Sequence, residues 1–112
     1  MTNLTVKLVD EYRKRYGLFL DRAQIGYAEI NFVNKTLEVF EMELNEKFRK
    51  QGHGEFFLNW LIENIGKPKN CTMVKVKWIQ PYLINSLRNR DFNEITEKSN
   101  VGVEISFIKN LN

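Results

Sequence analysis

The sequence predicts an α+β protein, in which two or so helices pack on a mixed, mostly antiparallel twisted sheet. Apolar and polar residues alternate at period two over much of residues 4–44 and again in the last third of the chain, as in half-buried strands. Residues 55–65 change to the helical period. The predicted order is four strands, a helix, a strand, a helix and two strands, which favours helices packed on one sheet.

Four strands are predicted before the first helix, and short polar segments connect them. A polar break at residues 10–14 separates the first two strands. Only Asn34 and Lys35 separate the third from the fourth, and because asparagine tolerates left-handed backbone angles we expect a tight hairpin there. The four predicted strands are residues 4–9, 16–20, 24–33 and 36–44.

Residues 55–65 predict an amphipathic helix with one broad apolar face. Gly66 follows the helix and is expected to cap its C-terminus, and Pro68 is expected to prevent its continuation. The apolar face consists of Phe57, Leu58, Leu61, Ile62 and Ile65.

The remaining elements complete the sheet. Pro81 is favoured in the first turn of a helix, so we expect a short helix from there to about Asn89. Trp60 and Trp78 are expected to fill the core, and Cys71 to be a small buried side chain. The predicted strands are residues 71–79, 92–98 and 102–111.

Size and composition limit the function classes. A chain of 112 residues forms one domain, residues 1–112, and its 43% hydrophobic and 28% charged content is that of an ordinary globular protein. No run of about 18 apolar residues exists, so no membrane-spanning helix is expected and the cytoplasm is the default location. Cys71 and His53 are the only residues of their types, which excludes an internal disulfide and argues against a metal site. A net charge of +3, spread along the chain, is weak support for binding nucleic acid.

Two glycines, Gly52 and Gly54, stand just before the first predicted helix. A flexible loop is the simplest interpretation. A dinucleotide-binding loop fails because its third glycine would fall at Phe57, and a phosphate loop of the Gly-Lys-Ser/Thr type fails because no such sequence follows. The order strand, polar turn, Arg49-x-x-Gly52-x-Gly54 and helix favours a third interpretation, a pyrophosphate cradle at the positive end of a helix.

At this point the chain resembles the GNAT superfamily of acetyl-CoA-dependent N-acetyltransferases. The hallmark of that family is Gln/Arg-x-x-Gly-x-Gly/Ala, which Arg49, Gly52 and Gly54 match. The resemblance covers roughly residues 15–110. Its other parts are residues 24–28, similar to the family's IVGxA strand, residues 89–92, at the place of a KxGF turn, and residues 102–111, similar to the final strand.

The resemblance implies a fold, a co-substrate and a reaction. The fold is the acyl-CoA N-acyltransferase fold, with central strands that splay apart. Acetyl-CoA is the implied co-substrate, and its pantetheine arm pairs with residues 38–44 where they diverge from residues 72–79. The acetyl group is transferred to a primary amine by direct attack in a ternary complex. The cofactor-binding residues implied are Met42, Leu44, Arg49, Lys50, Gln51, Gly52, His53, Gly54 and Glu55.

The reaction needs a base, because a lysine amine with a pKa near 10.4 is mostly protonated at neutral pH. A carboxylate is the economical choice. Strict alternation places Glu38 on one face of its strand with Phe40 and Met42, and Glu41 on the other face with Glu43. Each acid also fits a solvated position on an open sheet face. Glu41 is favoured for its central position, with Glu38 second.

The sequence departs from the family pattern in two places. The family's tyrosine, which often protonates the leaving thiolate, falls at Leu87, so Tyr82 is the remaining candidate acid. The helices that the family normally has between its first two strands are replaced by residues 10–14, so the acceptor side is shortened or completed by another subunit.

These departures leave alternatives open. One is a non-catalytic acyl-CoA-binding module, and another is a small phage or mobile-element protein that acts through a partner. The amine acceptor is a protein lysine, a protein N-terminus or a small amine. An exposed sheet edge would also allow a homodimer.

Overall fold

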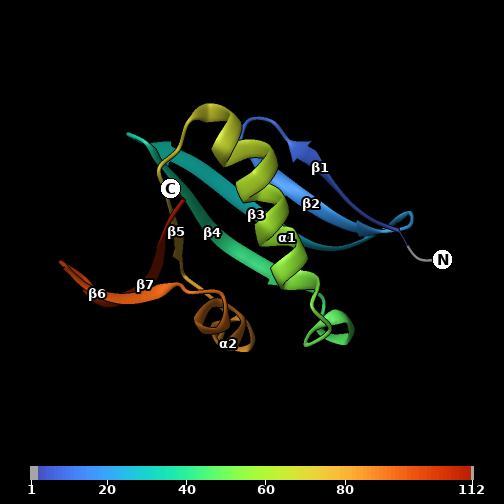
Figure 1. Cartoon of the computed structure of the whole chain (residues 1–112). Helices are drawn as coiled ribbons and strands as arrows, with labels where there is room; N and C mark the ends of the chain where they lie inside the picture. The colour runs from blue at the N-terminus through green and yellow to red at the C-terminus, as the bar shows by residue number, and fades with distance from the viewer. Residues whose placement is uncertain (1–2, 112) are drawn as a thin grey trace.

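One seven-stranded sheet runs through the molecule (Figure 1), in the order β1-β2-β3-β4-β5-β7-β6. The structure is a computed structural model and describes residues 3–111. Every neighbouring pair of strands is antiparallel except β4 and β5, which are parallel, so the predicted mixed sheet is confirmed. The strands are β1 (Leu4–Asp10), β2 (Arg15–Leu20), β3 (Ala23–Val33), β4 (Thr36–Leu44), β5 (Met73–Lys77), β6 (Asn93–Ser99) and β7 (Gly102–Asn110).

The hairpin between β3 and β4 has the predicted geometry. Val33 pairs with Thr36, so only Asn34 and Lys35 form the turn. Asn34 has a φ of 56°, a left-handed value that asparagine adopts more readily than most residues. The turn chemistry therefore fixes how β3 and β4 are aligned.

The first helix, α1 (His53–Leu61), continues without a break into a π-type turn, η2 (Ile62–Gly66), and a 3₁₀ turn, η3 (Lys67–Lys69). The helical segment therefore extends past Pro68, which lies in the first turn of η3. Pro68 stands just after the change from the π-type turn to the 3₁₀ turn, and the prediction that it prevents continuation of the helix is wrong. Asn70, with a φ of 60°, ends the segment, and its N–H donates to the Lys67 carbonyl at 2.9 Å.

The prediction that Gly66 caps the helix is wrong. Gly66 has right-handed helical angles, with φ −67° and ψ −55°. A Cβ at this position would lie 3.1 Å from a methyl carbon of Leu37 in β4. The glycine therefore allows close packing of the helix on the sheet.

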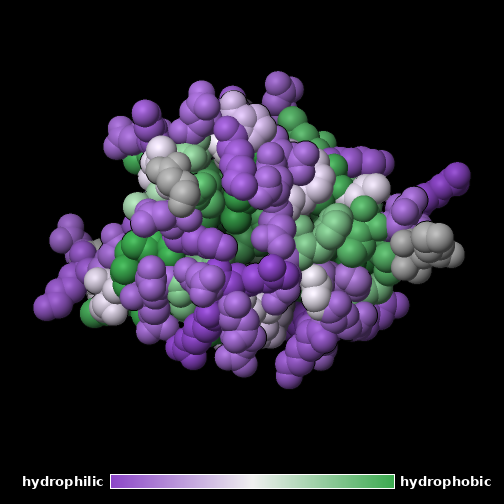
Figure 2. All heavy atoms as spheres, viewed as in Figure 1, coloured by the Kyte–Doolittle hydropathy of each residue, from purple (hydrophilic) through white to green (hydrophobic). Residues whose placement is uncertain are grey.

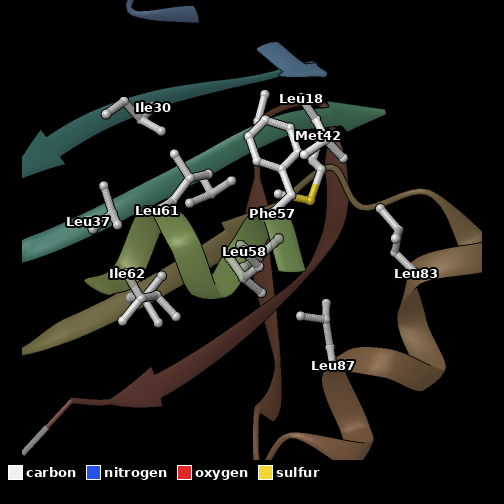
Figure 3. Packing of buried hydrophobic residues seen from close by; sticks show 14 of the residues in the cluster. Leu18, Ile30, Leu37, Met42, Phe57, Leu58, Leu61, Ile62, Leu83 and Leu87 are labelled. Atoms are coloured by element: carbon white, nitrogen blue, oxygen red, sulfur yellow. The ribbon is translucent and has the colours of Figure 1, made fainter. Parts of the chain in front are cut away.

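Both helices lie on the same side of the sheet (Figure 1). α1 crosses β2, β3 and β4, and its Phe57 and Leu61 are fully buried. α2 (Pro81–Asn89) adds Leu83 and Leu87, which point toward Phe57 and Leu58 (Figure 3). Among the described residues no helix covers the other face of the sheet, and none is long and apolar enough to cross a membrane.

The helices cover a hydrophobic core and carry mostly hydrophilic residues on their outer surface. The space-filling view shows mostly hydrophilic residues over the helices, with hydrophobic surface on both sides of them (Figure 2). The core beneath consists of aliphatic and aromatic residues from both helices and the sheet, and includes Leu18, Ile25, Leu37, Val39, Leu44, Phe57, Leu61, Val74, Val76 and Phe107.

β5 is shorter than predicted, and this creates an opening in the sheet. Its ladder with β4 ends where Phe40 pairs with Lys77, although β4 continues to Leu44. Trp78 follows with a φ of 53° and is 52% exposed, so the expectation that it fills the core is wrong. The predicted splay between the central strands is thereby confirmed, and it begins after Phe40.

We expect Phe57→Ala to lower the free energy of unfolding by about 3–5 kcal/mol, because the fully buried ring leaves a cavity between α1 and the sheet. Phe56→Ala is the matched control, because the neighbouring ring is 36% exposed and its loss is expected to cost less than about 1 kcal/mol. Chemical denaturation of both variants measures the difference. Equal losses would contradict the packing of α1 described above.

Candidate functional site

A β-bulge interrupts β4 at the start of the splay. Phe40 pairs with Glu29 on β3, but the next facing pair is Glu43 with Tyr27, so β4 has one more residue than β3 between the two pairs. Glu41 has a φ of 55°, a value that is uncommon for a residue with a side chain. The bulge therefore changes which face the following side chains point to.

The strict alternation assumed for β4 is wrong beyond this bulge. Met42 is buried, like Val39 and Leu44, on the face that the helices cover. Glu43 lies on the helix-free face with Phe40, because its cross-strand partner is Tyr27. Glu41 is exposed at the bulge itself, and Glu38 is half-buried on the helix-free face.

The loop between β4 and α1 uses two left-handed residues. Lys50 has a φ of 62° and Gly52 a φ of 83°. A Cβ at Gly52 would meet no atom within 4 Å, so the backbone angle, and not a lack of space, requires glycine there. This loop directs the chain into the first turn of α1, and a short 3₁₀ turn, η1 (Glu46–Phe48), precedes it.

The first turn of α1 presents free backbone donors. The Phe56 N–H bonds to the Gly52 carbonyl at 3.1 Å and begins the helical ladder. The N–H groups of the three preceding helical residues have no partner inside the helix. Gly52 has no side chain to cap them, so this end of α1 is polar and positively polarised. These residues are His53, Gly54 and Glu55.

Gly54 has a further structural role that the sequence did not indicate. A Cβ at this position would lie 2.5 Å from a methyl carbon of Leu83 in α2. The glycine is buried and allows the first turn of α1 to approach α2 closely. A side chain there would push the two helices apart.

A wide cleft of about 920 Å³ opens between this loop and α2. Its basic side chains are Arg49 and Lys50, and its acid, Glu55, bonds to Arg90 at 2.9 Å. That ion pair reduces the negative charge at the helix terminus, so the cleft favours an anion. The cleft is lined by Arg49, Lys50, Gly52, Glu55, Gln80, Pro81, Tyr82, Asn85 and Ser86.

Three groups meet at the end of β4. The Leu44 N–H donates to the Tyr82 hydroxyl at 2.8 Å, and Arg49 Nε donates to the Leu44 carbonyl at 2.9 Å. The Arg49 guanidinium lies 4.2 Å from the centre of the Tyr82 ring, within cation–π distance. Arg49 also lies 3.9 Å from the Glu43 carboxylate.

A second, much smaller cavity of about 20 Å³ lies between α1, α2 and β4. It shares Glu55 and Ser86 with the wide cleft but is otherwise mainly apolar. Leu87, where the resemblance would place a tyrosine, is buried and lines it. Its other lining residues include Met42, Gly54, Leu58, Leu83 and Phe92.

Charged side chains form a network on the helix-free face. Arg15 bonds to the buried Glu29 at 2.8 Å, and its guanidinium lies 4.3 Å from the centre of the Tyr27 ring. The hydrogen bond to Glu29 is the largest cause that raises the pKa of Arg15, and Glu41 adds a smaller electrostatic contribution. Tyr27 donates its hydroxyl to Glu43 at 3.0 Å. Glu41 follows Phe40, the cross-strand partner of Glu29, and so lies next to this network.

The structure brings most of the predicted cofactor-binding residues to one end of the sheet. Arg49, Lys50, Gly52 and Glu55 line the wide cleft, and Met42 and Gly54 line the small cavity. The side chains of the remaining residues face the loop or the core: Gln51 donates to the Lys47 carbonyl at 2.8 Å, His53 packs on Phe48 and Leu44 is buried.

Sequence reasoning missed the residues that α2 contributes to the cleft. Gln80, Asn85 and Ser86 line it beside Tyr82. The position of Pro81 is the sequence feature that could have indicated them. Pro81 starts α2 soon after β5 ends, so the first turns of α2 lie near the splay. No group of three or more His, Cys, Asp or Glu side chains in residues 3–111 is arranged to hold a metal ion.

Solved structures of N-acetyltransferases share this architecture. PaiA N-acetyltransferase from Thermoplasma acidophilum, in complex with coenzyme A, superposes with a TM-score of 0.64 at 18% identity over 86% of this chain. The ribosomal-protein-alanine N-acetyltransferase from Escherichia coli gives 0.70 at 13% identity over 95% of it. This chain has the GNAT N-acetyltransferase fold. The prediction of that fold is therefore confirmed.

The solved structures that share this fold differ in length. N-acetylglutamate synthase from Neisseria gonorrhoeae, complexed with coenzyme A and N-acetylglutamate, superposes with a TM-score of 0.70 at 12% identity over 88% of this chain. This chain spans 59% of the PaiA protein, 91% of the Escherichia coli enzyme and 26% of the synthase. No protein-family model and no curated protein sequence matches this chain.

Tyr27 gives the fold a dependence on alkaline pH. Burial, followed by the hydrogen bond to Glu43, raises the pKa of Tyr27 above its usual value near 10. The protonated Tyr27 hydroxyl therefore contributes its full stabilisation of the fold below pH 10, and this contribution is lost as the pH rises through the pKa of the folded state. We expect the free energy of unfolding to fall above pH 10, and to fall less steeply in Tyr27→Phe.

Denaturation at a series of pH values measures this slope. Tyr12→Phe is the matched control, because Tyr12 is 96% exposed. A Tyr27→Phe variant with the same slope as wild type would show that this hydroxyl does not contribute.

Proposed function

We propose that this protein is an N-acetyltransferase that moves an acetyl group from acetyl-CoA to a primary amine by direct attack in a ternary complex. The observation that carries the proposal is the loop between β4 and α1. Left-handed Gly52 leads into an uncapped helix N-terminus beside a basic cleft, at the point where β4 has left β5. The GNAT fold of the whole chain supports the same reaction class.

The residues of this loop fit the charged end of CoA. Backbone N–H groups at the start of α1 and the helix dipole favour a pyrophosphate. Arg49 and Lys50 line the same cleft and add positive charge. Met42 and Leu44 lie on the part of β4 that pairs with β3 but not with β5, where the pantetheine arm would run. Gln51, His53, Gly54 and Glu55 contribute backbone groups to the cradle.

The reaction requires one proton to leave the amine. The amine nitrogen attacks the thioester carbonyl carbon, a C–N bond forms, the C–S bond breaks and CoA leaves as a thiolate. Glu41 is the favoured base because it is exposed at the bulge, next to the opening between β4 and β5. Glu38, half-buried within the paired part of β4, is the second candidate.

Proton delivery to the thiolate is a weaker requirement. A thiol pKa near 8.5 makes the thiolate a tolerable leaving group without an acid. Tyr82 is the candidate acid, because Leu87 replaces the family's tyrosine and is buried. A slow transferase is the expected consequence.

The acceptor class is proposed only as a primary amine, either a protein lysine or N-terminus or a small amine. The relatives support this breadth, since the names of two of them refer to a ribosomal-protein alanine and to N-acetylglutamate. Acetyl-CoA and the acceptor are the proposed partners, in the cytoplasm, with a homodimer as the proposed assembly. A non-catalytic acyl-CoA-binding module is the second candidate function, and the burial of Leu87 favours it.

We expect Gly52→Asp to weaken CoA binding about tenfold or more relative to Gly52→Asn. Both residues tolerate left-handed angles, but only Asp places a carboxylate against the phosphates. Isothermal titration of both variants measures the difference. Equal affinities would rule out a phosphate site at this loop.

We expect Glu41→Gln to lower kcat/KM by about 10²–10⁴ at neutral pH, with partial recovery at higher pH, where more of the amine is already neutral. Glu38→Gln tests the second candidate in the same assay, and Glu11→Gln, in the exposed turn between β1 and β2, is the control. Full activity of both variants at pH 7 would show that neither carboxylate is the base. Tight CoA binding with no turnover on any amine would support the binding module instead.

A further inference from the structure

The end of β4 presents backbone groups toward the splay. The Asn45 N–H bonds to the Ile25 carbonyl on β3 at 2.8 Å. Backbone groups of successive strand residues point to opposite edges, so the N–H and C=O of Leu44 face the side where β5 is absent. A buried backbone group without a partner costs free energy, and Leu44 is 1% exposed.

Two side chains supply the bonds that a neighbouring strand would otherwise make. The Tyr82 hydroxyl accepts from the Leu44 N–H at 2.8 Å and lies 3.4 Å from its carbonyl oxygen. Arg49 Nε donates to that carbonyl at 2.9 Å, and the guanidinium covers the Tyr82 ring. We call these three residues the latch.

The latch borders the wide cleft, which shares Glu55 and Ser86 with the small cavity. Arg49 and Tyr82 line the wide cleft of about 920 Å³, whereas the small cavity of about 20 Å³ lies deeper, between the helices. The small cavity holds about one water molecule. Leu83 and Gly54, which lie against each other, both line it. A chain of atoms that ran along β4 and accepted from the Leu44 N–H would displace the Tyr82 hydroxyl.

Different contacts hold the two ends of α2. Arg90 bonds to Glu55 of α1 at 2.9 Å, and Arg88 bonds to Glu94 of β6 at 2.9 Å. The first turn is joined to β5 through residues 78–80, which are outside any helix or strand. The hydrogen bond between Tyr82 and the Leu44 backbone is the polar contact that joins the first turn of α2 to β4.

We infer that the first turn of α2 is a lid over the pantetheine groove, and that the Tyr82 hydroxyl holds it closed by competing with the pantetheine arm for the Leu44 N–H. This inference rests on the proposed function, because it assigns the groove to CoA. One N–H cannot donate fully to two acceptors, so the latch reduces the fraction of protein that is ready to bind the arm. The apparent affinity for CoA is the intrinsic affinity multiplied by that fraction.

Tyr82→Phe tests the lid, because it keeps the ring beneath Arg49 and removes only the hydroxyl. We expect it to tighten CoA binding about two- to tenfold, which is the effect of one or two ordinary hydrogen bonds. A nucleotide fragment of CoA that lacks the pantetheine arm is the matched ligand, and its affinity is expected to be unchanged. Titration calorimetry with both ligands gives the two ratios.

Backbone amide exchange measured by NMR gives a readout that needs no ligand. The Leu44 amide is expected to exchange faster in Tyr82→Phe than in wild type. Tyr12→Phe, the same substitution at an exposed position, is expected to change neither exchange nor affinity.

The outcomes separate the lid from the function on which it rests. Unchanged or weaker CoA binding by Tyr82→Phe, or an equal change for the fragment, would overturn the lid and leave the proposed function standing. Failure of wild type to bind either ligand would overturn both. Unchanged exchange at Leu44 would show that Tyr82 does not hold this backbone group.

Discussion

The arrangement of the site depends on one constraint: β4 is paired along its whole length with β3 but with β5 only as far as Phe40. A sheet strand that loses one neighbour must have its backbone groups satisfied in another way. At Leu44 the substitutes come from the two elements that follow the opening, the loop that contains Arg49 and the helix that contains Tyr82. The opening in the sheet therefore brings these elements together.

Residue patterns predicted the fold well because most of its elements obey a single period. Alternation over much of β1 to β3 and in β4 as far as Phe40, the helical period around Phe57 and the Asn34 turn each reflect local rules, and the structure follows them. The errors occur where tertiary packing overrides the local rule. The sequence around Gly66 predicts a helix end, but the close approach of Leu37 explains this glycine. The strand pattern predicts a core position for Trp78, but β5 ends just before it.

The same distinction applies to the candidate site. Gly52 could be found from sequence, because a left-handed position before a helix favours glycine. The bulge could not be found from sequence, because its left-handed position is occupied by Glu41 and not by glycine or asparagine, the residues that usually indicate such a position. The partner of Leu44 could not be found either, since Tyr82 is 38 residues away and only the path of the chain after β5 brings it near.

The bulge also means that β4 carries one residue more than its pairing with β3 needs. Glu41 is that residue, between the facing pairs Phe40 with Glu29 and Glu43 with Tyr27. If Glu41 were deleted, strict alternation would carry Met42, Glu43 and Leu44 to the faces that they already occupy, opposite the same partners on β3. The deletion would therefore keep the core, and it would remove only the left-handed backbone position and the exposed carboxylate beside the opening.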